Sequence, residues 1–183
     1  MINRYVDDIF LGTTSATIGV SFKRKKIDVY NLTIDSQIWD FGGEEKYRIL
    51  FPAYVHGAAA ALVLYDTTNR ETLEEVKEWM QILDRNASNI VKVLIGAKSD
   101  LNDQKEVNLE DAKKISQECG CYDDPVETSS KTGDNVEVAF LKIARGIVER
   151  QLQKCPACKK MFAKKLKICQ YCGENIVLEI IST

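Results

Sequence analysis

The sequence has no long apolar run, no leader-like start and no recognisable anchor. Its longest apolar run, Ala58 to Tyr65, is eight residues long, whereas a membrane span needs roughly 20. The first residues, MINRYVDDIF, contain acids where a signal peptide needs an apolar stretch, and the ending EIIST matches no lipidation motif. We therefore expect a cytoplasmic protein with no transmembrane segment and no lipid anchor.

The sequence also has no dominant charge. Lys and Arg number 25 and Asp and Glu 27, so the formal net charge is -2. This balance gives no indication that the chain as a whole binds nucleic acid or membranes. Six cysteines without a secretion signal favour metal ligands or structural thiols over disulfides.

The order of the predicted elements indicates an α/β fold with a doubly wound, mostly parallel sheet. Two continuous apolar runs, 60–65 and 91–96, are typical of strands buried on both faces. A hairpin with its turn at Tyr30 and Asn31 is expected before them. The remaining predictions are a helix over 70–87, a second helix from Asn108 to Gly120, a short strand over 125–128 and a last helix over 135–153.

Polar motifs follow three of these strands. DFGG ends the second hairpin strand, AKSD follows the strand at 91–96, and SSK follows the strand at 125–128. Each motif alone is compatible with a turn or a solvated loop. Ligands of doubly wound sheets bind at the carboxyl ends of the strands, so three such motifs in this order favour a ligand site there.

With these motifs in register, residues 3–153 resemble the small Ras-like GTPases, most closely the Rab-type branch. ATIGVSF at 16–22 resembles the first switch, WDFGGEE at 39–45 the second, and GAKSDL at 96–101 the guanine-specificity motif, with ETSSK at 127–131 completing the pocket. The resemblance implies a fold of the P-loop NTPase type, GTP or GDP as ligand with Mg²⁺, GTPase activity, and protein effectors and regulators at the switches.

The resemblance also implies roles for single residues. An aspartate in the guanine motif can accept hydrogen bonds from two donors of guanine and rejects adenine, which lacks them. A hydroxyl and a carboxylate are the hard oxygen ligands that suit Mg²⁺. The implied nucleotide-binding residues are Thr17, Asp40, Gly43, Lys98, Asp100, Ser130 and Lys131, with Thr17 and Asp40 also at the magnesium ion and Gly43 at the γ-phosphate.

Three features depart from the family pattern. The phosphate-binding pattern G-x-x-x-x-G-K-[ST] occurs nowhere in the 183 residues. Glu44 stands where the family has its water-positioning Gln, so hydrolysis should be slow. Ala97 replaces the usual Asn of the guanine motif, which removes a hydrogen-bonding tie.

The family's first strand, which lies between the strands expected at 33–39 and 60–65, is missing as well. Each buried backbone group that it leaves unpaired would cost on the order of 1–3 kcal/mol, against a typical domain stability of about 5–15 kcal/mol. Two explanations stay open: a sequence shortened at its N-terminus, which we favour, or a relative that has repaired its sheet.

Residues 154–183 are predicted to form a separate zinc ribbon after a GTPase domain at 1–153. Two C-x-x-C pairs supply Cys155, Cys158, Cys169 and Cys172. Each pair makes a tight turn that directs two thiolates at one ion, and two pairs complete a tetrahedron. A redox dithiol and four unrelated thiols are the alternatives.

The ribbon is rich in lysine, for which we favour simple solvation; weak contact with an anionic surface is the alternative. Two further functions stay open for the whole chain. One is a GTPase-like scaffold that binds partners without nucleotide, and the other is a nucleic-acid adaptor that acts through the ribbon.

Overall fold

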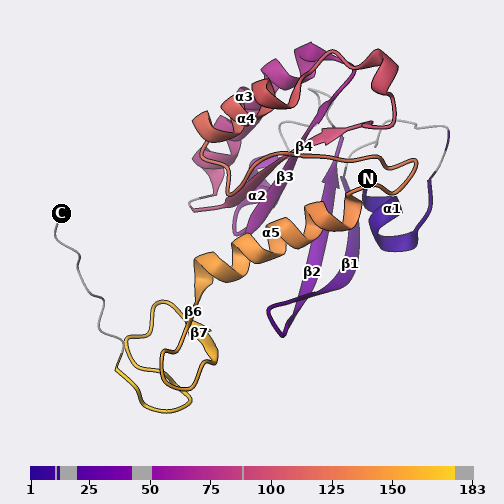
Figure 1. The fold of residues 1–183 in the computed structure, drawn as a ribbon. Helices are drawn as coiled ribbons and strands as arrows, with labels where there is room; N and C mark the ends of the chain where they lie inside the picture. Colours follow the sequence, from indigo (N-terminus) through magenta and orange to yellow (C-terminus); the bar gives the residue numbers. More distant parts are fainter. Residues whose placement is uncertain (11, 13–19, 43–50, 88, 176–183) are drawn as a thin grey trace.

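The computed structural model describes the whole chain except residues 11, 13–19, 43–50, 88 and 176–183, and Figure 1 shows its arrangement. Strands β1 (Val20–Val29) and β2 (Leu32–Phe41) form an antiparallel hairpin. Strands β3 (Ala60–Asp66), β4 (Val91–Ala97) and β5 (Val126–Glu127) form a parallel sheet in that order. The predicted strands are therefore confirmed, with small shifts at their ends.

The predicted helices are confirmed too. Helix α3 (Arg70–Asn86) and helix α4 (Leu109–Glu118) lie on one side of the parallel sheet, and α5 (Val136–Gln151) lies on the other (Figure 1). Two short helices, α1 (Ile2–Asp7) and α2 (Phe51–Val55), and a 3₁₀ turn at Asn102–Gln104 complete the helical elements of the described residues.

Local signals in the sequence explain where these elements begin and turn. The Asn108 side chain accepts a hydrogen bond from the N–H of Asp111 at 2.8 Å, as an N-cap of α4 should. Gly120, with φ of 63°, follows the end of α4. Tyr30 and Asn31 have φ of 51° and 62°, which is the left-handed pair that a two-residue hairpin turn requires.

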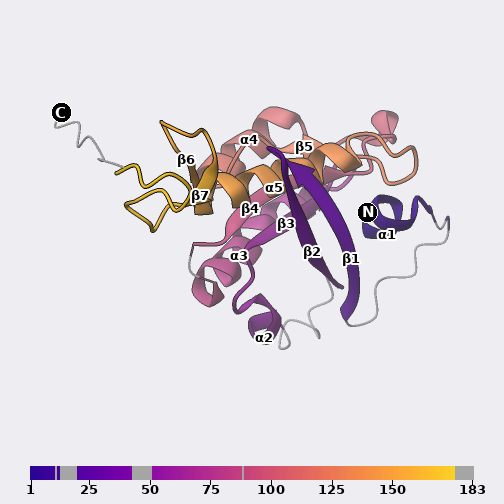
Figure 2. The ribbon, with the colours of Figure 1, turned by 90° about the horizontal axis from the view of Figure 1, so that it is seen from below.

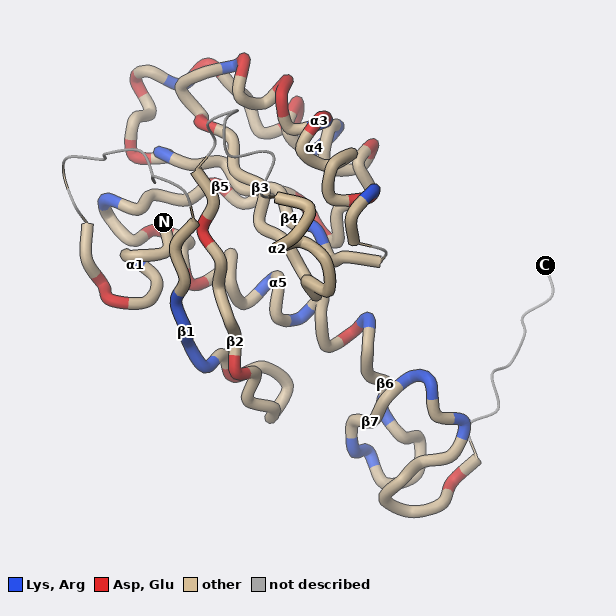
Figure 3. The backbone as a smooth tube through the Cα atoms, turned by 180° about the vertical axis from the view of Figure 1, so that it is seen from behind, with Lys and Arg blue, Asp and Glu red and all other residues tan. Residues whose placement is uncertain are grey.

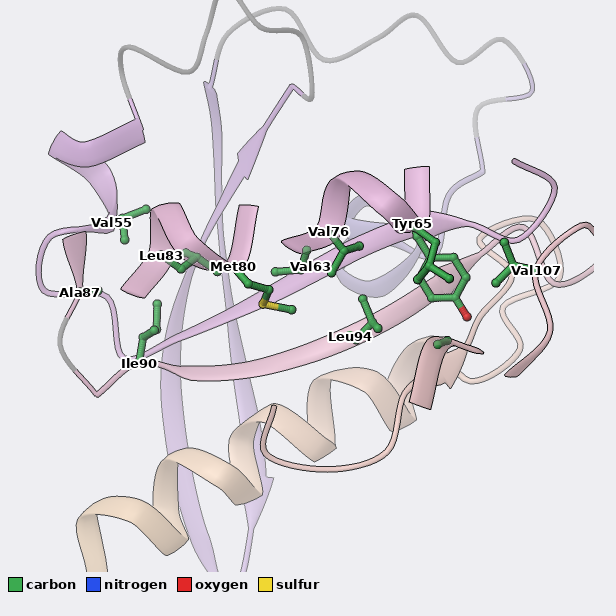
Figure 4. Close-up of a cluster of buried hydrophobic side chains, with 12 residues drawn as sticks. Val55, Val63, Tyr65, Val76, Met80, Leu83, Ala87, Ile90, Leu94 and Val107 are labelled. Atoms are coloured by element: carbon green, nitrogen blue, oxygen red, sulfur yellow. The ribbon is translucent and has the colours of Figure 1, made fainter. Parts of the chain in front are cut away.

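The core is built on both faces of the parallel sheet. The predicted stripe of α3 is buried and packs against β3 and β4, as Figure 4 shows. On the other face, α5 packs against β4. The α3 stripe consists of Leu73, Val76, Met80 and Leu83, and the residues of α5 that meet β4 include Ala139 and Ile143.

The sheet is divided where the sequence predicts a missing strand. Among the described residues, no strand joins β2 to β3, and Figures 1 and 2 show the β1–β2 hairpin standing beside the parallel sheet without joining it. Strand β4 is buried along its first six residues, whereas Leu64 of β3 is 43% exposed. No helix in the described ranges is both long and apolar enough to cross a membrane.

The C-terminal ribbon follows α5 without a linker. Helix α5 ends at Gln151, two residues before the predicted end, because Leu152 already pairs with Ala163. This pairing joins β6 (Leu152–Lys154) to β7 (Met161–Ala163), and the ribbon projects beyond the end of α5 (Figure 1). Its core consists of Phe162, Leu166 and three of the four predicted ligand cysteines.

Candidate functional site

The loops after β4 and β5 meet, and their contact defines the candidate guanine site. The N–H of Ser99 donates to the carbonyl of Thr128 at 3.1 Å, and the N–H of Thr128 donates to the carbonyl of Gly96 at 2.7 Å. The hydroxyl of Ser129 donates to Oδ1 of Asp100 at 2.6 Å. The structure therefore brings the predicted residue Asp100 against the loop that carries Ser130 and Lys131.

Ser129 organises this loop. It is fully buried, and its Oγ accepts hydrogen bonds from the N–H groups of Lys131 at 3.2 Å and Thr132 at 3.1 Å. The Ser129 hydroxyl thus donates a hydrogen bond to the Asp100 carboxylate and accepts two from the backbone that follows it. The sequence analysis assigned no role to Ser129, although it stands inside the SSK motif beside two residues that were assigned one.

Arg4 of α1 also contacts this loop, through hydrogen bonds to two of its carbonyl groups. Its Nε donates to the carbonyl of Ser130 at 2.9 Å, and its Nη2 donates to the carbonyl of Lys131 at 2.8 Å. Both carbonyls consequently point toward α1. Sequence reasoning gave no signal for this contact, because more than 120 residues separate the partners.

The predicted residue Lys98 forms an ion pair at the end of β3. Its Nζ lies 2.5 Å from Oδ2 of Asp66, and its backbone has φ of 65°. The other oxygen of Asp66 accepts hydrogen bonds from the N–H and hydroxyl of Thr68. Burial alone would raise the pKa of Asp66, but the bonds from Lys98 and Thr68 outweigh it and lower this pKa below its usual value.

Asp40 occupies the penultimate position of β2, opposite Ser21 in the hairpin register. Burial lowers the pKa of the Met1 amine, and the charge of Asp40 acts in the opposite direction, so the two groups lie within electrostatic reach. The other residues predicted at the phosphate and magnesium, Thr17, Gly43 and Glu44, lie outside the described residues. The structure therefore gathers the guanine-side residues and describes Asp40 alone on the phosphate side.

Aromatic side chains from β1, β2 and α2 cluster on the surface near the end of the hairpin. The ring of Trp39 lies 4.8 Å from that of Phe22 and 5.2 Å from that of Tyr54. All three are 40–46% exposed. Large exposed apolar side chains gathered in one place are typical of a protein interaction site.

The four ribbon cysteines converge on one point. Sγ of Cys155 lies 3.6 Å from Sγ of Cys172, Cys158 and Cys169 are likewise 3.6 Å apart, and all four sulfurs lie within 4.8 Å of one another. These distances exclude disulfides, which need about 2.05 Å. With Zn–S bonds of about 2.3 Å, a regular tetrahedron has sulfur–sulfur edges of about 3.8 Å. The cluster thus fits a four-thiolate metal ion.

Two matching turns create this cluster. The N–H of Lys159 donates to the carbonyl of Cys155, and the N–H of Gly173 donates to the carbonyl of Cys169. Lys159 and Gly173 have φ of 62° and 75°. Burial opposes ionisation of Cys155, but hydrogen bonds from the N–H groups of Cys158 and Ala157 outweigh it and lower its pKa to about 7. A thiolate is the form that binds metal.

Six lysines lie in the ribbon, and Figure 3 shows blue segments along its backbone. All six are exposed, which is compatible with the predicted contact with an anionic surface. That contact stays a prediction. The six lysines are Lys154, Lys159, Lys160, Lys164, Lys165 and Lys167.

Comparison with known proteins identifies the family of this chain. Residues 1–149 match the model of the Ras family. The chain is 38% identical to the Ras-related protein Rab5 of Nicotiana tabacum over 158 residues, which are 86% of this chain and 78% of that protein. It is 40% identical to the Ras-related protein RABF2b of Arabidopsis thaliana over 79% of this chain and 72% of that protein. The GTP-binding protein YPTM2 of Zea mays is 39% identical over 82% and 73%. The chain belongs to the Ras superfamily of small GTPases and is Rab-like.

Proposed function

We propose that this protein is a GTP- and GDP-dependent switch that regulates the binding of protein partners and hydrolyses GTP slowly. The observation that carries the proposal is the hydrogen bond between Ser129 and Asp100. It fixes a carboxylate at the meeting point of the loops after β4 and β5. A carboxylate held in advance costs little ordering when a ligand binds.

The groups around Asp100 complement guanine. Of the two carboxylate oxygens of Asp100, Oδ1 accepts a hydrogen bond from the described residues and Oδ2 accepts none. The N–H of Ser130 donates no hydrogen bond to the described residues. The carboxylate can accept from the N1–H and N2–H₂ donors of guanine, and an N–H group can donate to its O6. Lys98 and Lys131 complete the proposed base pocket.

On the phosphate side we propose Thr17 and Asp40 at Mg²⁺ and Gly43 at the γ-phosphate. Bound Mg²⁺ neutralises phosphate charge in this class of enzyme. Glu44 would add negative charge there, so we expect slow hydrolysis. The G-x-x-x-x-G-K-[ST] pattern is absent from the 183 residues, and the proposal assigns no residue to its part.

We further propose that 154–183 is a separate domain whose cysteine cluster holds structural Zn²⁺. All four positions of the tetrahedron are filled by protein thiols, which is typical of closed structural sites. The ribbon core is small, so the ion would supply much of its folding free energy.

Binding of fluorescent GDP tests the nucleotide proposal. We expect saturable binding to the purified chain, and Asp100→Asn should exchange guanine for xanthine preference, because an amide can donate to the xanthine O2. Asp103→Asn, in the exposed turn that follows, is the matched control and should leave binding unchanged. Absence of binding to the wild-type chain would refute the switch.

A scaffold that binds partners without nucleotide is the second candidate. The exposed cluster of Phe22, Trp39 and Tyr54 favours it, because a partner could use this surface whatever the nucleotide state. The same GDP titration separates the two functions.

A further inference from the structure

Positive charge is concentrated in the ribbon. Its described part, residues 154–175, carries six lysines and a single acid, Glu174, and Figure 3 shows the corresponding blue segments. The whole chain has a net charge of -2, so the remainder is acidic on balance. Within the described ranges, none of the six lysines forms an ion pair with a carboxylate. The ribbon therefore has the unpaired charge that attracts an anionic partner.

Two large apolar side chains are exposed on the same ribbon. Ile168 is 53% exposed and Tyr171 is 51% exposed, and neither belongs to the ribbon core. The Nζ of Lys160 lies 4.9 Å from the centroid of the Tyr171 ring, where the ring attracts a cation. About half of the Tyr171 surface stays open to solvent. An aromatic ring beside a lysine can stack on a nucleobase while the ammonium meets the phosphate.

The two cysteine turns fix the positions of Lys160 and Tyr171. The carbonyl of Lys160 accepts a hydrogen bond from the N–H of Cys155 at 2.9 Å. Tyr171 stands between the two cysteines of the second C-x-x-C pair. All four sulfurs lie within 4.8 Å of one another, so the turns cannot move apart without separating the sulfurs. The lysine and the ring are held together before a ligand binds, which lowers the entropic cost of binding.

We propose that the ribbon binds single-stranded nucleic acid, with a base stacked on Tyr171 and phosphates at Lys160 and the other ribbon lysines. A single strand is favoured over a duplex, because its bases are free to stack on a side chain. It is favoured over a lipid surface, because burial of Tyr171 among acyl chains would also bury the Lys160 ammonium, at a high cost in free energy. The proposal goes beyond the guanine-nucleotide switch and does not depend on it.

Fluorescein-labelled oligothymidylate and oligouridylate of about 12 nucleotides are suitable probes, since single-strand sites span roughly 4–16 nucleotides. We expect saturable fluorescence anisotropy with the full chain, purified with zinc present. The logarithm of the association constant should fall against the logarithm of salt concentration with a slope of about −2 to −4, as about three to six neutralised phosphates require. The tighter of the two probes identifies DNA or RNA as the ligand.

Excess GDP separates this site from the GTPase domain. Neither probe contains guanine, so GDP at saturating concentration should leave the affinity of the ribbon for both oligonucleotides unchanged. The switch and the ribbon site can consequently fail independently of each other.

Three ribbon variants test the stacking contact. Tyr171→Ala should weaken binding at least about fivefold, the lower end of the effect of losing one stacked base. Tyr171→Phe keeps the ring and should bind within about twofold of the wild type. Ile168→Ala, at a site of similar exposure without a ring, should also change the affinity less than about twofold.

A matched pair of lysine variants tests the phosphate contacts. Lys160→Met should make the salt slope shallower by about 0.7, the share of one phosphate. Lys114→Met removes the same charge from α4, where the side chain is 72% exposed, and should leave the slope unchanged.

Several results would overturn the proposal. Undetectable binding of both oligonucleotides would do so, as would Tyr171→Ala that binds as tightly as the wild type or no more weakly than Tyr171→Phe. Displacement by GDP would assign the binding to the GTPase site. Phosphatidylserine vesicles that displace the oligonucleotide, and that bind less well to Ile168→Ala, would assign the ribbon to a lipid surface. Polyglutamate that displaces it at equal charge concentration would assign the ribbon to acidic proteins.

Discussion

Replacement of Ser129 by alanine should destabilise the protein through one buried hydroxyl. The Oγ of Ser129 donates to Asp100 at 2.6 Å, a distance typical of a charge-assisted hydrogen bond. Such a bond contributes about 1.5–3 kcal/mol. The N–H groups of Lys131 and Thr132, which lose the same acceptor, belong to exposed residues that water can reach. We therefore expect a net loss of about 2–3 kcal/mol, set mainly by the carboxylate bond.

Urea unfolding at pH 7, followed by tryptophan fluorescence, measures this loss. Ser116→Ala is the matched control, because Ser116 is also buried and donates to a neutral acceptor, the carbonyl of Asp123, at 3.1 Å. The control should cost about 1 kcal/mol. A double-mutant cycle with Asp100→Ala should then give a coupling free energy of about 1–2 kcal/mol.

Equal losses for the two serine variants would refute the reasoning. So would a coupling of zero, since it would mean that the hydroxyl and the carboxylate contribute independently. Ser129→Thr keeps the hydroxyl and should recover part of the loss, which separates the hydrogen bond from packing.

Two further predictions concern the ion pair and the ribbon. Lys98→Met should raise the pKa of Asp66, which the lysine now holds below its usual value, and carboxyl NMR titration would detect the change. The stability that this pair contributes is present above the ordinary carboxyl pKa of 3.8 and is lost as the pH falls through the lowered pKa, so the variant should lose stability at neutral pH and little in acid. The purified chain should contain one equivalent of zinc by elemental analysis, and Cys169→Ser should lose most of it, whereas Cys119→Ser, outside the cluster, should keep it.

Results that contradict the Asp66 and zinc predictions can be measured in the same experiments. An unchanged pKa of Asp66 in Lys98→Met would assign the depression to Thr68 alone. Zinc retained in full by Cys169→Ser, or absent from the wild-type chain under reducing and metal-replete conditions, would contradict the four-thiolate site.

Much of the architecture could be predicted from local patterns. The stripe of Leu73, Val76, Met80 and Leu83 is buried as its spacing requires, and Asn108 caps its helix as its side chain permits. Both depend on contacts within a few residues, which a linear pattern records directly. The bracing of the base loop by Arg4 could not be predicted, because it depends on which segments the fold brings together.

The sequence alone predicted the family, the two C-x-x-C pairs that meet in one cluster and the order of the strands along the chain, since each depends on residue types at fixed spacing. The comparisons confirmed the family, while the zinc and nucleotide roles stay proposals. Only the tertiary structure decided that Ser129 holds Asp100 and that the four sulfurs meet at bonding distance of one ion. Each of these is a distance between segments far apart in the chain, and packing of the whole domain sets such distances.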